Sequence, residues 1–477
     1  MRILLATYWQ LPFVGGISAY TEQLKMKLES MGHEVDVLGN GIDRYHIIHN
    51  YRSIHKDRIM PLLRAKLNPQ VVPLLHKSDY VQHSEFDRYC LELSAAYLGL
   101  HQYDLIHTQD ILSTRALSRV KPKTTPLVAS IHGCAAREVL LDLSTQMPEE
   151  TVRNSIIWNY YSAMELFGVK ASDITITSSN WLKHLLVNEF SAPSERITVF
   201  PYGMDIPSFL QKMEHGNPVE VPAGKKVIIC TCRLEHIKGV HILLHALSTV
   251  KALREDWVCW IVGDGTQMWM LQKLTADLGL GQDVQFLGRR NDVPYLLRHS
   301  DLFVLASLQE NQPFSIMEAE IAGLPVIVSD VAGLPEMVDN GRIGLIFPNG
   351  NSEVLASQIV TLLGNDNYRG KLGAKAKQWG MKQWSMDTMA KQLLHTYELA
   401  KRKYSSKNRI SRPIHSGAQE ANGMEIIGDL YNRLFAEQVS NPDVTVDYFI
   451  WNRIYNSLPS DYSLPDQTFL AALQNNV

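Results

Sequence analysis

The sequence predicts an α/β protein with two doubly wound, Rossmann-like domains that face a central cleft, followed by a mainly helical C-terminal extension. Two observations support this fold class. Short, nearly continuous apolar runs recur up to residue 347, and stretches with helical spacing separate them. Such runs are typical of strands that are buried on both faces of a parallel sheet. Because strands and helices alternate through two successive sets, we expect two domains of this kind.

The first domain is predicted to span residues 1–203. Between its first two strands, Tyr20, Leu24 and Leu28 recur at helical spacing and predict a helix with one apolar face. A Pro-Tyr-Gly sequence at residues 201–203 ends the set. The predicted strands of this domain are Ile3–Thr7, Val35–Gly39, Leu105–Thr108, Leu127–Ile131, Ile174–Ser178 and Ile197–Phe200.

The second domain is predicted to span residues 204–380. Residues 205–225 contain several Gly and Pro residues and lack a clear periodicity, which predicts a linker or an opening loop. Strand ends from both domains can face one cleft, so a bound ligand would touch loops from both halves. The predicted strands of this domain are Val227–Thr231, Val258–Val262, Val284–Leu287, Leu302–Ala306, Val326–Ser329 and Ile343–Phe347.

The composition is that of an ordinary globular protein and excludes several classes. Hydrophobic residues make up 45% of the 477 residues and charged residues 20%, which excludes a disordered or fibrous chain. No apolar run approaches the roughly 20 residues of a membrane-spanning helix. The N-terminal apolar run is interpreted as a buried strand rather than a signal peptide, so we expect a cytoplasmic protein. The net charge of −3 gives no case for nucleic-acid binding.

The five cysteines are predicted to be buried thiols rather than disulfide or metal ligands. No C-x-x-C pair occurs, and the number of cysteines is odd. Cys230 and Cys232 lie two apart in an apolar run, so we expect both side chains on one face of a strand.

A glycine pair, Gly15 and Gly16, joins the first predicted strand to the first predicted helix. Adjacent glycines let the backbone approach a ligand closely, and the helix start offers unpaired N–H groups that suit a phosphate or diphosphate. A glycine pair in such a turn is also common without any ligand, so both interpretations stay open.

Two cations and two further glycines follow strands of the second domain. Arg233 and Lys238 come after its first strand, where an arginine fork and a lysine charge can bind a diphosphate. They can equally be surface cations of a loop. Gly263 and Gly265 follow the next strand and form either another close backbone approach or a turn.

Two glutamates, Glu310 and Glu318, stand where a loop is predicted to become a helix near Ser315. A loop followed by a helix can direct both carboxylates into the cleft, where they would accept hydrogen bonds from sugar hydroxyls. The alternative is a solvated glutamate at a helix start, stabilised by the helix dipole.

Taken together, CRLEHIKGV, IVGDG, ENQPFSIMEAEIAGLPVI and the N-terminal glycine turn resemble glycosyltransferase family 4. The resemblance covers roughly residues 1–400. It implies the two-Rossmann-domain glycosyltransferase B fold and a retaining reaction. It also implies that residues 381–404 form a closing helix that packs back toward the N-terminal domain. The extension, residues 405–477, is not covered and has no predicted role beyond a few helices packed on the body through residues such as Phe449, Trp451 and Phe469.

The resemblance also implies roles for individual residues. The expected catalytic residues are Glu310, near the anomeric centre, His132, beside the sugar, and the diphosphate-binding pair Arg233 and Lys238. Glu318 would bind the nucleotide ribose. The expected donor-binding residues are Gly15, Gly16, Arg233, Lys238, Gly263, Gly265, Glu310, Phe314, Ser315 and Glu318.

One departure from the family pattern concerns the sugar. Where the family often has Glu-x-Phe-Gly, this chain has Glu310, Asn311, Gln312 and Pro313. Proline has no N–H, so a sugar hydroxyl bound by that donor would lose its partner here. The sugar, the base and the acceptor are not predicted.

No cofactor and no metal are expected. The chain has no D-x-D sequence of the kind that bridges a metal to a diphosphate, and the two cations can neutralise the leaving group instead. The predicted function is transfer of a hexose-type sugar from a nucleotide-diphosphate sugar to an acceptor hydroxyl. The alternatives are a nucleotide-sugar epimerase on the same fold and a non-catalytic nucleotide-sugar-binding scaffold.

A basic segment at residues 52–77 suggests one further partner. It has a charge of +5 from residues such as Arg58, Arg64 and Lys66, with apolar residues between them. Such a segment can contact the anionic inner face of a membrane. Its prolines exclude a long helix, and a solvated acceptor-side loop is the preferred interpretation.

Overall fold

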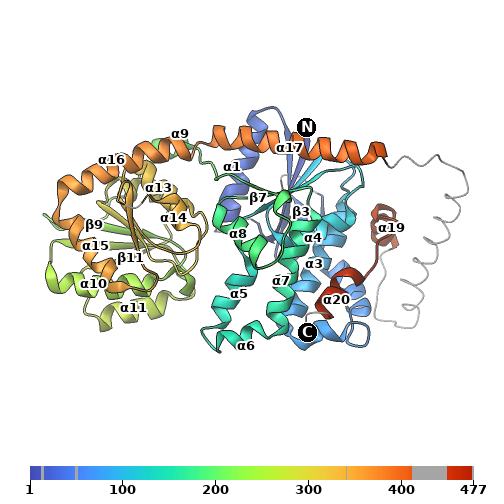
Figure 1. Ribbon diagram of the computed structural model, residues 1–477, viewed down its shortest axis with the longest axis horizontal. Helices are drawn as coiled ribbons and strands as arrows, with labels where there is room; N and C mark the ends of the chain where they lie inside the picture. The colour runs from blue at the N-terminus through green and yellow to red at the C-terminus, as the bar shows by residue number, and fades with distance from the viewer. Residues whose placement is uncertain (12–15, 49–51, 340, 411–447, 475–477) are drawn as a thin grey trace, which may run out of the picture. The chain divides into compact units, whose positions relative to one another are not determined.

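The computed structural model describes residues 1–11, 16–48, 52–339, 341–410 and 448–474. The chain folds into two compact units, and each unit is discontinuous in sequence (Figure 1). Unit 1 comprises Met1–Ile176, Leu185–Thr198 and Leu393–Val477, and unit 2 comprises Thr177–His184 and Val199–Gln392. The boundaries predicted at residues 203, 380 and 404 stay predictions.

Within the described residues, unit 1 is built on a sheet with the order β4-β3-β2-β1-β5-β6-β7-β8. Strand β1 lies centrally and pairs in parallel with β2 and β5, while β3 and β4 form an antiparallel edge. The strands are β1 Arg2–Gln10, β2 Glu34–Asn40, β3 Arg44–Ile47, β4 Ser53–His55, β5 Leu105–Thr108, β6 Leu127–Ile131, β7 Ile174–Thr177 and β8 Ile197–Val199. The predicted strands of the first half are thus confirmed, and β3 and β4 are additions.

Helices connect the strands of this sheet. They are α1 Gly16–Ser30, α2 Met60–Lys66, α3 Asp79–Leu98, α4 Ile111–Val120, α5 Ala135–Leu143, α6 Glu149–Arg153, α7 Ile156–Ala171 and α8 Asn180–Asn188, with short 3-10 helices at Lys56–Arg58, Pro73–Lys77 and Ser194–Arg196. The chain returns to unit 1 through α17 (Met386–Ile410), where Tyr397 is fully buried and its hydroxyl lies 2.7 Å from His107 Nδ1. Helices α19 (Tyr448–Ser457) and α20 (Gln467–Gln474) complete its described part.

Unit 2 is built on a second sheet, whose order among the described residues is β11-β10-β9-β12-β13-β14. All of its pairings are parallel. The strands are β9 Lys226–Thr231, β10 Trp257–Val262, β11 Val284–Gly288, β12 Leu302–Leu305, β13 Val326–Ser329 and β14 Gly344–Phe347, which confirms the strands predicted for the second half. The helices are α9 Ile206–Lys212, α10 Val240–Leu253, α11 Met268–Asp277, α12 Val293–Arg298, α13 Phe314–Ala322, α14 Leu334–Met337, α15 Ser352–Gly364 and α16 Asp366–Gln383, and a 3-10 helix covers His236–Lys238.

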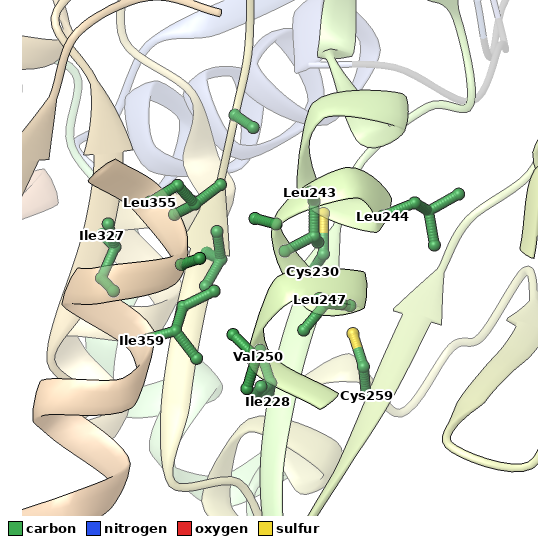
Figure 2. Close-up of a cluster of buried hydrophobic side chains, with 14 of the residues drawn as sticks. Ile228, Cys230, Leu243, Leu244, Leu247, Val250, Cys259, Ile327, Leu355 and Ile359 are labelled. Carbon is green, nitrogen blue, oxygen red and sulfur yellow. The ribbon is translucent and has the colours of Figure 1, made fainter. Parts of the chain in front are cut away.

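The core of unit 2 lies where α10 and α15 cover one face of this sheet. Figure 2 shows Leu243 and Leu247 of α10 and Ile359 of α15 directed toward strand residues such as Ile228 and Cys230. Every one of these side chains is at most 1% exposed. Trp260 and Phe303 are equally buried but lie outside this cluster. Both sheet faces are therefore covered, which explains why the strands read as continuous apolar runs.

The structure corrects three expectations. Residues 205–225 are not entirely linker, because the Asp205 side chain accepts the Ser208 N–H (3.1 Å) and caps α9. Cys232 lies just after β9 and is partly exposed, so it is not the buried thiol that was expected, although its Sγ lies 3.9 Å from that of Cys230. Phe449 does not anchor the extension, since 71% of it is exposed, whereas Trp451 is 7% exposed.

The basic segment at residues 52–77 has most of its apolar side chains buried. Its apolar residues Ile59, Leu63 and Leu75 are fully buried, so they belong to the core of unit 1 and are not available to a lipid surface. Val71 of the same segment is 52% exposed, and contact with a membrane stays a prediction. Among the helices of the described ranges, none combines the length and the apolar composition that a membrane span requires.

Candidate active site

The strand order of unit 2 places its candidate residues at a switch point of the sheet. Successive connections run from β9 outward to β10 and β11, and then return to β12 on the other side of β9. In open parallel sheets, ligands bind at the carboxyl ends of the strands at such a point. The loop after β9 carries Arg233 and Lys238, and the loop after β12 carries Glu310.

These two loops are joined to each other. The Leu308 N–H donates a hydrogen bond to the Ile237 carbonyl (2.8 Å). Gly239 has a φ of +62°, and a Cβ placed there would lie 1.8 Å from the Ala306 oxygen. Only glycine fits this close approach, so the backbone fixes the spacing between the two loops.

Lys238 and Glu310 form an ion pair at this junction. The Lys238 ammonium group contacts Glu310 Oε2, and the two side chains are 13% and 18% exposed. The Gly333 N–H donates to the Glu310 carbonyl (3.0 Å), which holds the backbone of the loop as well. Lys238 and Glu310 were predicted from two separate motifs, and the fold brings them together as one ion pair. Because the pair is largely shielded from water, its electrostatic attraction is stronger than it would be in solution.

Arg233 stands apart from this pair. Its side chain is exposed, and no described residue forms an ion pair or hydrogen bond with it. The glycines of the IVGDG sequence support its loop, because a Cβ on Gly263 would lie 1.8 Å from the Cys232 oxygen and one on Gly265 would lie 2.5 Å from the Leu234 oxygen. The close approach at these glycines is therefore to the backbone of the neighbouring loop, which fixes the main chain on both sides of Arg233.

Helix α13 carries the remaining candidates of unit 2. It begins at Phe314, one residue before the predicted start, and no side chain caps it. The Phe314 ring stacks on Tyr202 with centroids 6.1 Å apart and an angle of 10°. Ser315 and Glu318 are partly exposed on the same helix. Loss of solvent raises the pKa of Glu318 to about 7, with Lys212 opposing that shift.

Sequence reasoning missed the residues that hold this loop. Asn311 Nδ2 donates to Ser178 Oγ (2.7 Å), and Asn311 Oδ1 accepts from the Ser179 hydroxyl. Gln312 Oε1 accepts the Tyr202 N–H (2.9 Å). Both amides are 6% exposed, so they face protein rather than solvent. The one sequence feature that pointed to these two residues is the departure from Glu-x-Phe-Gly. From the sequence it indicates a change in the contacts to the sugar, not the hydrogen bonds that hold the loop.

The other predicted residues belong to unit 1. His132 follows β6, and its Nε2 lies 3.1 Å from Gln109 Oε1 while the Tyr20 ring packs edge-on at 5.0 Å. Burial lowers the pKa of His132 to about 3, so the imidazole is neutral at physiological pH. Gly16 opens α1, and a Cβ there would meet no atom within 4 Å. Gly15 lies outside the described residues.

No described set of three or more His, Cys, Asp or Glu side chains could hold a metal ion.

Two family models match this chain, one in each half. The model described as Glycosyltransferase Family 4 matches residues 14–207, and the model described as Glycosyl transferases group 1 matches residues 212–379. An uncharacterized glycosyltransferase of Methanocaldococcus jannaschii is 28% identical over 84% of this chain and 98% of its own length.

Two further proteins bear on the same assignment. A UDP-Gal:alpha-D-GlcNAc-diphosphoundecaprenol alpha-1,3-galactosyltransferase of Escherichia coli is 31% identical over 52% of this chain and 64% of its own length. The crystal structure of Anabaena HepE in complex with UDP shares the fold, with a TM-score of 0.58 and 20% identity over 83% of this chain and 100% of that one. The family matches in both halves and these relatives identify the chain as a group 1 glycosyltransferase of the family 4 type.

Proposed function

We propose that this glycosyltransferase is a retaining, metal-independent enzyme that moves a hexose from a nucleotide-diphosphate sugar to an acceptor hydroxyl. The observation that carries the donor assignment is the Lys238–Glu310 pair at the switch point, with the exposed Arg233 on the same loop. Retention of configuration rests on the family resemblance. A hexose donor is supported by the galactosyltransferase relative, and a uridine nucleotide by the UDP bound to HepE.

The proposed chemistry assigns each group a task. The bond between the anomeric carbon and the diphosphate oxygen breaks, and negative charge develops on the diphosphate. The acceptor oxygen bonds to the anomeric carbon and gives its proton to the departing diphosphate oxygen. Arg233 and Lys238 stabilise the negative charge on the diphosphate. In metal-dependent transferases a divalent ion has this task. The Glu310 carboxylate, held by Lys238, accepts a hydrogen bond from the sugar, and Glu318 accepts hydrogen bonds from the ribose hydroxyls.

The uncapped start of α13 adds a second source of positive potential. The first N–H groups of a helix have no partner inside the helix and attract anions. Phe314 and Ser315 supply these groups here, and Phe314 is held by its stacking on Tyr202. We propose that the diphosphate lies between this helix start and the two cations. The roles expected for Gly15, Gly16 and His132 stay predictions.

A donor panel tests the proposal. UDP-, GDP- and ADP-hexoses are assayed for nucleotide release with sugar and lipid-linked acceptors, with and without excess chelator. At least one donor should turn over only when an acceptor is present, and chelator should leave its rate unchanged. NMR of the product should show the anomeric configuration of the donor.

Other outcomes would identify the alternatives. Sugar interconversion without acceptor would establish the epimerase. Tight nucleotide binding without turnover of any donor would favour the scaffold. Activity that chelator abolishes and a divalent ion restores would refute metal independence.

A further inference from the structure

The C-terminal segment of residues 448–474 contributes a buried charged residue to unit 1. Helix α19 contacts α3, and α20 contacts α7 (red helices in Figure 1). Asp466, which caps α20 by accepting the Phe469 N–H (3.3 Å), is 1% exposed. A carboxylate this deeply buried requires charged partners.

Those partners are arginines of α3 and α4. Arg115 Nε donates to Asp466 Oδ2 (3.0 Å), and Arg119 Nη1 lies 3.1 Å from Asp466 Oδ1. Arg119 also contacts Glu92 (3.0 Å), which in turn accepts from the fully buried Arg88 (2.8 Å).

The charges in this cluster balance only when the segment is present. Helices α3 and α4 supply three guanidinium groups, from Arg88, Arg115 and Arg119, against the two carboxylates of Glu85 and Glu92. Asp466 supplies the third carboxylate, and among the described residues it is the one that pairs with Arg115. If the Asp466 carboxylate is removed while the segment stays in place, the Arg115 guanidinium, which is only 14% exposed, loses its ion-pair partner, and this is unfavourable.

Apolar and backbone contacts make the site specific for this segment. The Phe469 ring is fully buried and meets Tyr160 and Phe167 edge to face, with centroids 5.6 and 5.4 Å away. The Asp466 N–H donates to the Tyr89 hydroxyl (2.7 Å), and the Ser463 carbonyl accepts from Arg119. Unit 1 thus contacts two features of the segment together: the acidic residue at the start of α20 and the buried aromatic ring three residues later in the same helix.

We propose that α3, α4 and α7 form a docking site for a short acidic-aromatic helical segment, and that residues 448–474 are its built-in ligand. The segment is held by non-covalent contacts strong enough to keep it in place after the chain is cut. The site is separate from the donor residues of unit 2, so this inference does not depend on the proposed reaction.

The experiment cuts the full-length chain. A protease recognition sequence is inserted between Asn422 and Gly423, the protein is cleaved, and size-exclusion chromatography at micromolar concentration shows whether the C-terminal fragment stays with the body. The fragment should co-elute. Asp466→Asn and Phe469→Ala should each weaken retention at least tenfold on dilution. Asp461→Asn, which removes an exposed pair with Lys123 (3.5 Å), is the matched control and should retain the fragment.

Separate elution of the unmutated fragment would overturn the proposal, as would equal retention in Asp466→Asn and the control. If the cut protein precipitates, hydrogen exchange on the uncut chain decides. Asp466→Asn should then increase exchange at residues 467–474 and in α4 by at least tenfold over Asp461→Asn. Equal protection in the two variants would overturn the proposal.

Discussion

Glu165 on α7 is a carboxyl group that folding keeps protonated. One oxygen accepts the Ala136 N–H (3.3 Å), and the other has no hydrogen-bond partner among the described residues. Burial raises the pKa of Glu165 to about 8, although the hydrogen bond from Ala136 opposes that shift. Because Ala136 lies in the first turn of α5, just after His132, this hydrogen bond joins α7 to that loop.

We expect Glu165→Gln to remove a pH dependence of stability. Between pH 4.5 and 8 the folded protein keeps this proton and the unfolded chain has lost it, so the free energy of unfolding falls as pH rises through that window. The slope is up to about 1.4 kcal/mol per pH unit. Urea unfolding from pH 5 to 8.5 should show a shallower decline in Glu165→Gln than in the exposed control Glu195→Gln. Identical slopes would contradict the assignment.

Arg233 should act on the chemical step. Because its guanidinium faces solvent with no described partner, its removal leaves no buried charge behind. We expect Arg233→Ala to lower kcat about 10²–10³-fold with a smaller effect on donor affinity. Arg298→Ala, which removes an exposed pair with Glu214, is the control for loss of a surface arginine. Unchanged kinetics in Arg233→Ala would exclude Arg233 from the site.

Glu318 should make nucleotide affinity depend on pH. An ionised carboxylate accepts hydrogen bonds from both ribose hydroxyls, and the pKa of Glu318 is raised to about 7. UDP affinity should therefore rise from pH 6 to pH 8 in the wild type. Glu318→Gln should bind more weakly and lack that part of the rise. Calorimetry on both proteins at the two pH values separates this effect from the titration of UDP itself, and equal affinities would count against the ribose role.

The loop between β12 and α13 is the element on which the candidate site depends most. It is fixed at Glu310 by Lys238, at Asn311 by Ser178 and Ser179, and at Gln312 by Tyr202. Since Ser178 and Ser179 belong to unit 2 in space but to the first half of the sequence, the loop is braced by a distant part of the chain.

Loss of this bracing should reduce turnover more than binding. Asn311→Ala removes two hydrogen bonds and should lower kcat by roughly 10²-fold while the KM of the donor changes little, because small misplacements of reacting groups are costly. Asn367→Ala, on the exposed surface of α16, is the control. If Asn311 acts through Ser178, the double variant Ser178→Ala/Asn311→Ala should be no slower than Asn311→Ala. Additive losses would show that the two residues act independently.

Strands could be predicted from the sequence more completely than the elements around them. Buried parallel strands are continuous apolar runs, so each predicted run became a strand. The antiparallel strands β3 and β4 are short and half polar, so they lack a strong hydrophobic periodicity. Helix α9 is also short, and its start depends on the cap at Asp205 rather than on a periodic apolar pattern. Motifs located Glu310 and Lys238, but their pairing depends on strand order, and the contacts of Asn311 join residues 133 positions apart.

At the scale of the whole molecule, the two units should respond to different perturbations. A nucleotide stabilises the unit that binds it, and the proposed donor residues belong to unit 2. We expect calorimetry of Asp466→Asn to show a lower transition temperature for unit 1, while UDP still raises the other transition as in wild type. Loss of the UDP-dependent shift in a folded Asp466→Asn protein would show that the segment also supports nucleotide binding.

The contact between Arg115 and Asp466 also sets an order of events during synthesis. These residues are 351 positions apart, so the arginine leaves the ribosome long before the carboxylate that neutralises it. At about 5–20 residues per second, that interval lasts roughly 20–70 seconds. Unit 2 lies between them in the sequence and can be completed first. During that interval the nascent N-terminal half has no ion-pair partner for Arg115, and the site that Phe469 fills is empty. Unit 1 can therefore complete its native contacts only after the C-terminal segment has been synthesised.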